Sequence, residues 1–172
     1  MTGRVKDREN NDTPVLSQDI ITDMIHMALQ ARKRAYTPYS HFQVGAALLA
    51  DAENQADEGA SEARVIITGC NIENAAYSPG NCAERTAVFK AVSEGYTGFH
   101  AIAIVAGKEG MTEAQLAKAD TYTSPCGMCR QVLREFVNPD TFLVIMAKSE
   151  TDYVVKTLSE LFPMSFGPDN LI

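Results

Sequence analysis

The chain has 172 residues, enough to bury the core of one domain, and its 22 acidic and 15 basic residues give a net charge of −7. This acidic balance argues against a nucleic acid polymer as partner, because neutralising phosphates requires a basic surface. The four cysteines favour a reducing compartment, and we see neither a signal peptide nor an apolar run long enough for a membrane span, so we expect a cytoplasmic protein.

The N-terminal part of the chain divides into a polar stretch and a first helix. Residues 1–16 hold little apolar content, so we expect a disordered extension there and a single domain over residues 17–172. Ser17 can cap a helix, and the apolar residues behind it recur at helical spacing: Ile21, Met24, Ile25, Ala28 and Leu29. This spacing predicts an amphipathic helix.

Two paired strands are expected next, over residues 42–50 and 65–69. The connection between them, residues 51–63, carries five acidic side chains. It exceeds the usual hairpin connection of about 2–5 residues, and we interpret it as a solvated surface loop. Gly45 marks a point in the first strand where neighbouring backbone can come close.

The rest of the chain alternates between predicted strands and helices. One helix is expected after Cys82 and ends near Gly95, and another follows Cys126 and ends at Asn138. Further strands are predicted over residues 101–106, 142–147 and 153–156, with a helical turn over 113–119 and a short helix over 158–162. This alternation implies a layered α/β fold.

Two short stretches carry most of the chemistry, and both are expected to begin helices. Cys126 and Cys129 are three residues apart, so a helix places both sulfur atoms on one face. Together with Cys82 they can bind zinc at about 2.3 Å and leave one tetrahedral position open, as catalytic zinc sites do. Glu84 lies two residues from a ligand and is placed to shuttle the protons of a water that the metal acidifies.

A structural zinc site is the competing interpretation, because Cys70 could supply a fourth thiolate. We favour a catalytic site because Glu84 and Arg85 add chemistry that a structural site does not need. Three thiolates should make a metal-bound water less acidic, and Arg85 and the two helix N-termini can withdraw charge from sulfur. None of the three histidines stands at a ligand spacing.

Five ordered sequence blocks extend the pattern beyond the metal. They are YSHFQVGAAL at 39–48, GCNIENA at 69–75, CAERTA at 82–87, SPCGMCR at 124–130 and SFGP at 165–168. On these blocks the chain resembles the cytidine deaminases, specifically their small homotetrameric zinc-dependent class, from about residue 20 to residue 171. The resemblance implies a three-layer α/β/α fold with a five-stranded mixed sheet and the two zinc helices side by side.

The resemblance also implies a reaction and its residues. Cytidine or deoxycytidine would be hydrolysed to uridine or deoxyuridine and ammonia, with one Zn²⁺ per chain bound by Cys82, Cys126 and Cys129. Glu84 would be the catalytic proton shuttle, and Arg85 would tune the charge of the thiolates. The implied substrate-binding residues are Phe42, Asn71, Glu73, Tyr77, Ala83, Ser124 and Phe166. Two of them, Tyr77 and Phe166, match positions that reach a neighbouring subunit's site, so a homotetramer with shared sites is implied.

Three alternatives stay open at this point. The blasticidin deaminases share the metal core, but this chain follows the cytidine deaminases over residues 71–77 and at Phe166. A deaminase that edits polynucleotides is disfavoured by the acidic balance. A zinc-stabilised binding module without chemistry would need a fourth protein ligand, for which Cys70 is the candidate.

Overall fold

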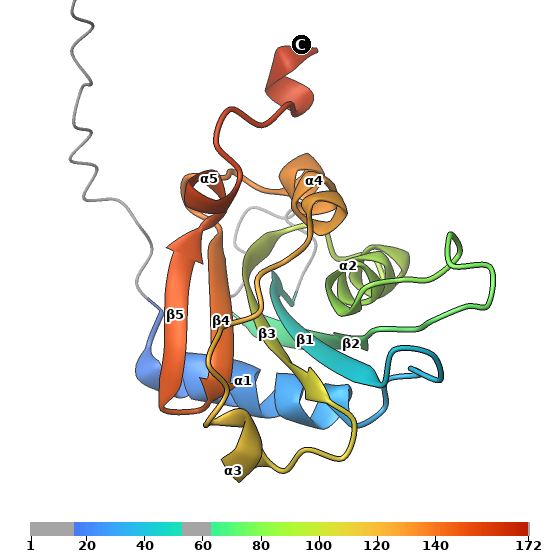
Figure 1. Cartoon of the computed structure of the whole chain (residues 1–172). Coiled ribbons are helices and arrows are strands. Elements are labelled where there is room, and N and C mark those ends of the chain that lie inside the picture. The colour runs from blue at the N-terminus through green and yellow to red at the C-terminus, as the bar shows by residue number, and fades with distance from the viewer. Residues whose placement is uncertain (1–15, 53–62, 172) are drawn as a thin grey trace, which may run out of the picture.

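The computed structural model describes residues 16–52 and 63–171, and its central element is a five-stranded sheet in the order β2-β1-β3-β4-β5 (Figure 1). The strands are β1 (Phe42–Asp51), β2 (Arg64–Cys70), β3 (Phe99–Lys108), β4 (Leu143–Ser149) and β5 (Asp152–Thr157). β3 and β4 run parallel, whereas the other neighbouring pairs are antiparallel. The five-stranded mixed sheet is confirmed, and each strand extends at most a few residues beyond its predicted range.

The helices lie on both faces of this sheet and also follow the sequence-based expectation. They are α1 (Gln18–Arg32), α2 (Ala83–Ser93), α3 (Glu113–Leu116), α4 (Gly127–Phe136) and α5 (Leu158–Leu161), with a 3-10 turn η1 (Pro168–Asn170) near the end. The Ser17 side chain accepts a hydrogen bond from the Ile20 N–H, so the predicted cap of α1 is confirmed. No helix within the described ranges is long and apolar enough to cross a membrane.

The three layers arise because side chains alternate between the two faces of a strand. Leu48 on β1 packs in the cluster beneath α2 and α4, which includes Val88 and Leu133. Its neighbour Leu49 packs in the cluster beneath α1, which includes Ile25. The expected three-layer α/β/α arrangement is therefore confirmed. The predicted extension over residues 1–16 and the acidic loop over 51–63 lie mostly outside the described residues.

Two strand glycines let helices approach the sheet closely. A Cβ atom at Gly45 would collide with the backbone of α1 at Ala28, which confirms the close approach expected there. A Cβ atom at Gly69 would collide with the carbonyl oxygen of Ala83, the first residue of α2. Gly69 therefore fixes the height of the α2 N-terminus above the sheet, and with it the position of the neighbouring Cys82.

We expect Gly69→Ala to lower the free energy of unfolding by about 2–3 kcal/mol, because the added methyl group must displace the backbone of α2. Urea denaturation of the purified variant measures this change. Gly127→Ala is the matched control, since a Cβ atom at Gly127 meets no atom within 4 Å. Equal unfolding midpoints for Gly69→Ala and this control would contradict the close packing of α2.

Candidate active site

Three thiols from two helix N-termini meet on one side of the sheet. Cys82 is the N-cap of α2 and Cys126 is the N-cap of α4, and neither side chain makes a capping hydrogen bond to its own helix. Cys129 lies in the first turn of α4 and is buried. The Sγ atoms of Cys82 and Cys126 are 3.8 Å apart, and those of Cys126 and Cys129 are 3.4 Å apart. Sequence spacing thus predicted both helix starts and the grouping of the thiols.

The arrangement of the three sulfur atoms fits one zinc ion. Ligands held about 2.3 Å from zinc at tetrahedral angles lie about 3.8 Å from one another. The three Sγ atoms all lie within 4.8 Å of one another, and Cys70 and the histidines are not in this group among the described residues. Cys70 ends β2 instead, and its side chain is half-buried. The cluster therefore offers three ligands, which leaves a tetrahedral ion one open position.

Positive charge surrounds the sulfur atoms. Nη2 of Arg85 donates to Sγ of Cys82 at 3.6 Å. The N-termini of α2 and α4 also face the cluster, and unpaired N–H groups with the helix dipole stabilise negative charge there. A hydrogen bond with Cys129 and the nearby Arg85 guanidinium lower the pKa of Cys82, whereas the same hydrogen bond and burial raise the pKa of Cys129. Arg85 therefore stabilises the thiolate form of Cys82 by direct contact.

Glu84 is a buried carboxyl group beside this cluster. Only 5% of the residue is exposed, although it occupies the first turn of a helix. Burial raises the pKa of Glu84 to about 7, and the negative charge of Cys82 contributes to the increase. A carboxyl group with a pKa near neutrality can both accept and release a proton, which general acid–base catalysis requires.

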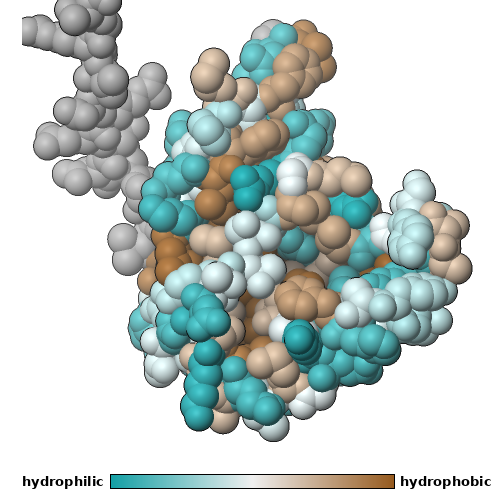
Figure 2. Space-filling view, viewed as in Figure 1, coloured by the Kyte–Doolittle hydropathy of each residue, from teal (hydrophilic) through white to brown (hydrophobic). Residues whose placement is uncertain are grey.

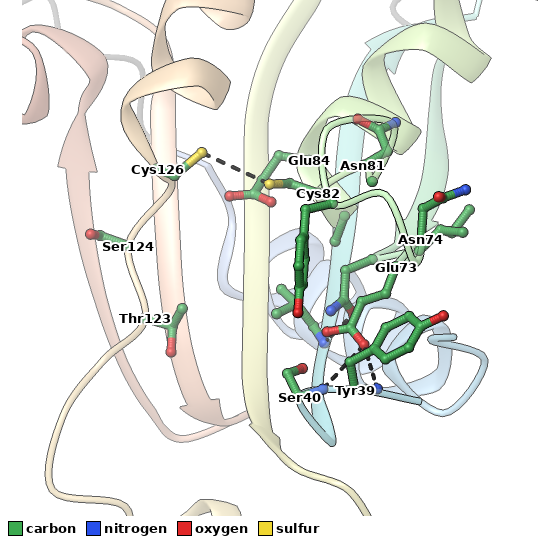
Figure 3. Close-up of a pocket in the computed structure, with 16 residues that line it drawn as sticks. Tyr39, Ser40, Glu73, Asn74, Asn81, Cys82, Glu84, Thr123, Ser124 and Cys126 are labelled. Carbon is green, nitrogen blue, oxygen red and sulfur yellow. Dashed lines mark hydrogen bonds between the residues drawn. The ribbon is translucent and has the colours of Figure 1, made fainter. Parts of the chain in front are cut away.

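The cluster opens into a pocket of about 620 Å³, a volume suited to a small-molecule ligand (Figure 3). In the close-up, Thr123 and Ser124 lie across the pocket from Tyr39, Ser40 and Glu73, with the thiols at one end. Eight of the residues singled out in the sequence line it: Asn71, Glu73, Tyr77, Cys82, Ala83, Glu84, Ser124 and Cys126. The structure therefore brings most of the expected site together.

Asn71 connects the pocket to the sheet. Its Oδ1 atom accepts a hydrogen bond from the Val44 N–H at 2.8 Å, and its Nδ2 atom donates to the Phe42 carbonyl at 2.9 Å. The side chain thus pairs with the backbone of β1 as a strand residue would. Because a primary amide has two protons, the Phe42 contact leaves Asn71 a second proton for a ligand.

Glu73 is held by the turn before β1. Its Oε2 atom accepts hydrogen bonds from the N–H groups of Tyr39 at 2.9 Å and Ser40 at 3.2 Å. A side-chain hydrogen bond from Ser40, followed by that from the Tyr39 backbone, lowers the pKa of Glu73. The charged carboxylate is therefore fixed in place, and its Oε1 atom can accept from a ligand hydroxyl group.

All three aromatic residues among the expected substrate-binding residues are exposed. Tyr77 lines the pocket with 82% of its surface exposed, whereas Phe42 and Phe166 do not line it. Phe166 belongs to the segment after α5, which extends away from the rest of the chain in Figure 1. Figure 2 shows hydrophobic side chains on this projecting segment, whose large exposed apolar residues are Met164, Phe166 and Leu171.

Sequence reasoning did not single out several residues that line the pocket. Tyr39 and Ser40 belong to the first sequence block and Thr123 precedes the fourth, so the blocks pointed to their neighbourhood. Asn81 also lines the pocket, and its Nδ2 atom donates to Oγ1 of Thr86. In the sequence, only its position directly before Cys82 indicates that Asn81 lies at the site.

Comparisons with known proteins agree with this geometry. Residues 19–146 match the family described as the cytidine and deoxycytidylate deaminase zinc-binding region. A cytidine deaminase of Sporosarcina psychrophila is 43% identical over 151 residues, covering 88% of this chain and 94% of the relative. The crystal structure of cytidine deaminase from Burkholderia pseudomallei superimposes with a TM-score of 0.65 at 37% identity, covering 84% of this chain and 97% of that one. A blasticidin-S deaminase of Bacillus cereus is 32% identical over 101 residues, covering 59% of this chain and 68% of the relative.

The fold and the thiol cluster define a zinc-binding deaminase. The chain belongs to the cytidine and deoxycytidylate deaminase family, because the family match spans most of the chain and the relative from Sporosarcina psychrophila aligns over nearly its whole length. The donor set agrees with this membership, and the three thiols and the family together indicate one zinc ion per chain.

We expect Arg85→Gln to weaken zinc retention about tenfold, because a neutral amide withdraws less charge from Cys82 than a guanidinium does. Zinc remaining per chain after equilibration with graded concentrations of a chelator measures this loss. Arg64→Gln makes the same chemical change at an exposed position on β2 and is the control. Identical chelator curves for the two variants would show that Arg85 does not act on the thiolates.

Proposed function

We propose that this chain deaminates cytidine and deoxycytidine hydrolytically, using one zinc ion and water and releasing uridine or deoxyuridine and ammonia. The observation that carries the proposal is the buried Glu84 beside a cluster of three thiols, both at one end of a nucleoside-sized pocket. Family membership and relatives named as cytidine deaminases over most of the chain support the choice of substrate.

The proton transfers are assigned to Glu84. Zinc bound by Cys82, Cys126 and Cys129 would supply a Lewis acid that makes water acidic near neutral pH. Glu84 accepts the proton of the attacking water and delivers it to the ring nitrogen next to the carbon that bears the amino group. It then takes the proton of the hydroxyl group now on that carbon and gives it to the amine, so that the C–N bond breaks, ammonia leaves and a carbonyl group forms. Burial of Glu84 suits it to both roles.

Backbone groups at the two helix starts orient the pyrimidine. Ala83 is the first residue of α2, so its N–H has no acceptor within the helix and can donate to the ring carbonyl oxygen. Ser124 lies across the pocket from Glu73 in Figure 3, and we assign its backbone carbonyl oxygen as the acceptor for the substrate's amino group. The carbon to be attacked is thereby directed toward Glu84 and the thiol cluster.

The sugar is assigned to the polar wall at the ends of β1 and β2. Asn71 retains an amide proton and Glu73 retains a carboxylate oxygen beyond their contacts within the chain. A donor next to an acceptor matches the hydroxyl groups of ribose or deoxyribose. Phe42 does not line the pocket itself, but its carbonyl accepts from Asn71, so we assign it to the edge of this wall. Phe166 does not line the pocket of its own chain, and we assign it, with the exposed Tyr77, to a site shared with another copy.

The alternatives account less well for these observations. A structural zinc module requires a fourth ligand, and Cys70 is not in the cluster. The blasticidin-type relative aligns over a smaller part of the chain than the cytidine deaminases do. A polynucleotide substrate would be repelled by a chain with a net charge of −7.

A homotetramer with shared sites is part of the proposal. Large apolar side chains are exposed around the pocket mouth and on the C-terminal segment, and such surfaces mark protein contacts: Tyr39, Phe42, Ile72, Tyr77, Met164 and Phe166. We place the enzyme in the cytoplasm, because its zinc-binding cysteines must remain reduced thiols. We assign it a role in pyrimidine salvage, because the proposed reaction converts one pyrimidine nucleoside into another.

The shared-site arrangement predicts the mass of the assembly in solution. Light scattering on the zinc-loaded protein should give about four times the chain mass of 18.7 kDa. A mass of one chain that persists at micromolar concentration, together with full activity, would refute the shared site.

The reaction is tested with the absorbance of cytidine in the ultraviolet. The wild-type protein should remove the cytidine band, and Glu84→Gln should retain its zinc while losing at least about a hundredfold in turnover. Glu94→Gln, at the other end of α2, is the matched control and should keep the wild-type rate. No loss of the band with zinc-loaded wild-type protein would redirect the search to blasticidin-type substrates. Full turnover by Glu84→Gln would refute the assignment of Glu84 as proton shuttle.

A further inference from the structure

One wall of the pocket is formed by a segment without regular structure. Residues 119–126, all within the described chain, connect α3 to α4 and belong to neither helix nor strand. This connecting segment contributes Thr123, Ser124 and Cys126 to the pocket lining. A segment without a ladder of backbone hydrogen bonds depends on side-chain contacts for its position. The contacts that hold it therefore bear on how a ligand is oriented.

Arg130 of α4 holds the end of the connecting segment that leads into the helix. Its Nε atom donates to the Pro125 carbonyl at 2.8 Å, and its Nη2 atom donates to Oγ of Ser124 at 3.2 Å. A third nitrogen, Nη1, donates to the Leu161 carbonyl in α5. These contacts tie the residues next to Cys126 to the body of the domain.

The hairpin of β4 and β5 holds the opposite end through Tyr122, Lys148 and Asp152. The Tyr122 hydroxyl donates to Oδ1 of Asp152 at 2.5 Å, and Nζ of Lys148 lies 2.9 Å from Oδ2 of the same carboxylate. The Lys148 ammonium also lies 4.5 Å from the centre of the Tyr122 ring and donates to the Ala119 carbonyl at 3.2 Å. One carboxylate and one ammonium group thus hold the segment at two points.

Charge makes this three-residue clamp, Tyr122, Lys148 and Asp152, persistent. The hydroxyl of Tyr122 and then the ammonium of Lys148 lower the pKa of Asp152, so the carboxylate stays charged at neutral pH. The side chain of Lys148 is 15% exposed and that of Asp152 is 39% exposed, so solvent screens their attraction only in part. An ammonium over an aromatic ring adds a further attraction that needs no hydrogen bond.

We infer that the clamp of Tyr122, Lys148 and Asp152 positions the Thr123–Ser124 wall of the pocket and thereby sets affinity for the pyrimidine. None of the three residues lines the pocket, so they act as positioning residues through their neighbours. The inference rests on the proposed function for its substrate. Arg130 holds Ser124 and Pro125 independently, so loosening the clamp should move Thr123 and loosen the wall at its Tyr122 end while Cys126 keeps its place.

The test compares two tyrosines whose hydroxyl groups donate to different elements, Tyr122 within the clamp and Tyr153 outside it. Tyr122→Phe removes the hydroxyl donor but keeps the ring, and Tyr153→Phe removes a hydroxyl on β5 that donates to Gln18 of α1. We expect Tyr122→Phe to raise KM for cytidine about fivefold with little change in kcat, while Tyr153→Phe behaves as wild type. Zinc should stay at one ion per chain in both, because Arg130 still holds the start of α4. Equal KM values for the two variants would overturn the inference.

A second measurement does not depend on catalysis. Chymotrypsin cleaves after tyrosine and phenylalanine alike, so native Tyr122→Phe protein keeps the cleavage site at position 122. The cleavage rate there should rise about fivefold over wild type, because it reports how often the segment opens. An unchanged rate would overturn the clamp, even if KM had shifted. If the wild type failed to deaminate cytidine, the proposed function would fall, and the cleavage rate would still decide whether the clamp holds the segment.

Asp152→Asn provides a variant that tests the charge. It keeps the size of the side chain but removes the ion pair with Lys148, and it should raise both KM and the cleavage rate at least as much as Tyr122→Phe. Circular dichroism and the thermal midpoint establish that the variant remains folded. A folded Asp152→Asn protein with wild-type KM and wild-type cleavage would count against the clamp as decisively as the tyrosine result.

Discussion

The structure depends on bringing two helix N-termini close enough for their thiols to share one ion. Cys82 and Cys126 are separated by a complete strand, β3, and by the long connection after it. β3 and β4 are parallel neighbours, so the chain must cross over between them, and α4 belongs to that crossover. α4 packs on the same face of the sheet as α2. The N-termini of the two helices lie side by side, because their N-cap thiols are 3.8 Å apart. Sheet order, rather than local sequence, therefore assembles the metal ligands.

The same arrangement offsets the electrostatic cost of gathering negative charge. Three thiolates and a carboxylate would repel one another in a buried site, and burial already raises the pKa of Glu84. Two helix dipoles and the Arg85 guanidinium supply the opposing positive charge without adding a fourth ligand. The elements that position the thiols are thus also the elements that make a group of thiolates tolerable, and an acid–base carboxyl group can remain among them.

Much of this could be predicted because the signals are local. Helix starts at Cys82 and Cys126 follow from apolar spacing and stop residues, and the close approach at Gly45 follows from a glycine within a strand. The exposure of single side chains was less predictable. The apolar strand pattern suggests that Phe42 is a core residue, but Phe42 is the first residue of β1 and is exposed. The contact of Tyr122 with Asp152 spans 30 residues and depends on where the β4–β5 hairpin lies. No periodicity encodes such a contact, because it arises only when separate elements pack.

The spacing of the sulfur atoms also has a consequence for redox chemistry. Cys126 is exposed and lies 3.4 Å from Cys129 and 3.8 Å from Cys82. In the presence of an oxidant, a thiol this close to two others is converted readily to a disulfide, and an oxidised pair can no longer bind a cation. Zinc would therefore protect the cysteines from oxidation as well as serve the reaction. A newly folded chain must acquire its metal while its surroundings are still reducing, and oxidation before that point would have to be reversed by a thiol reductant.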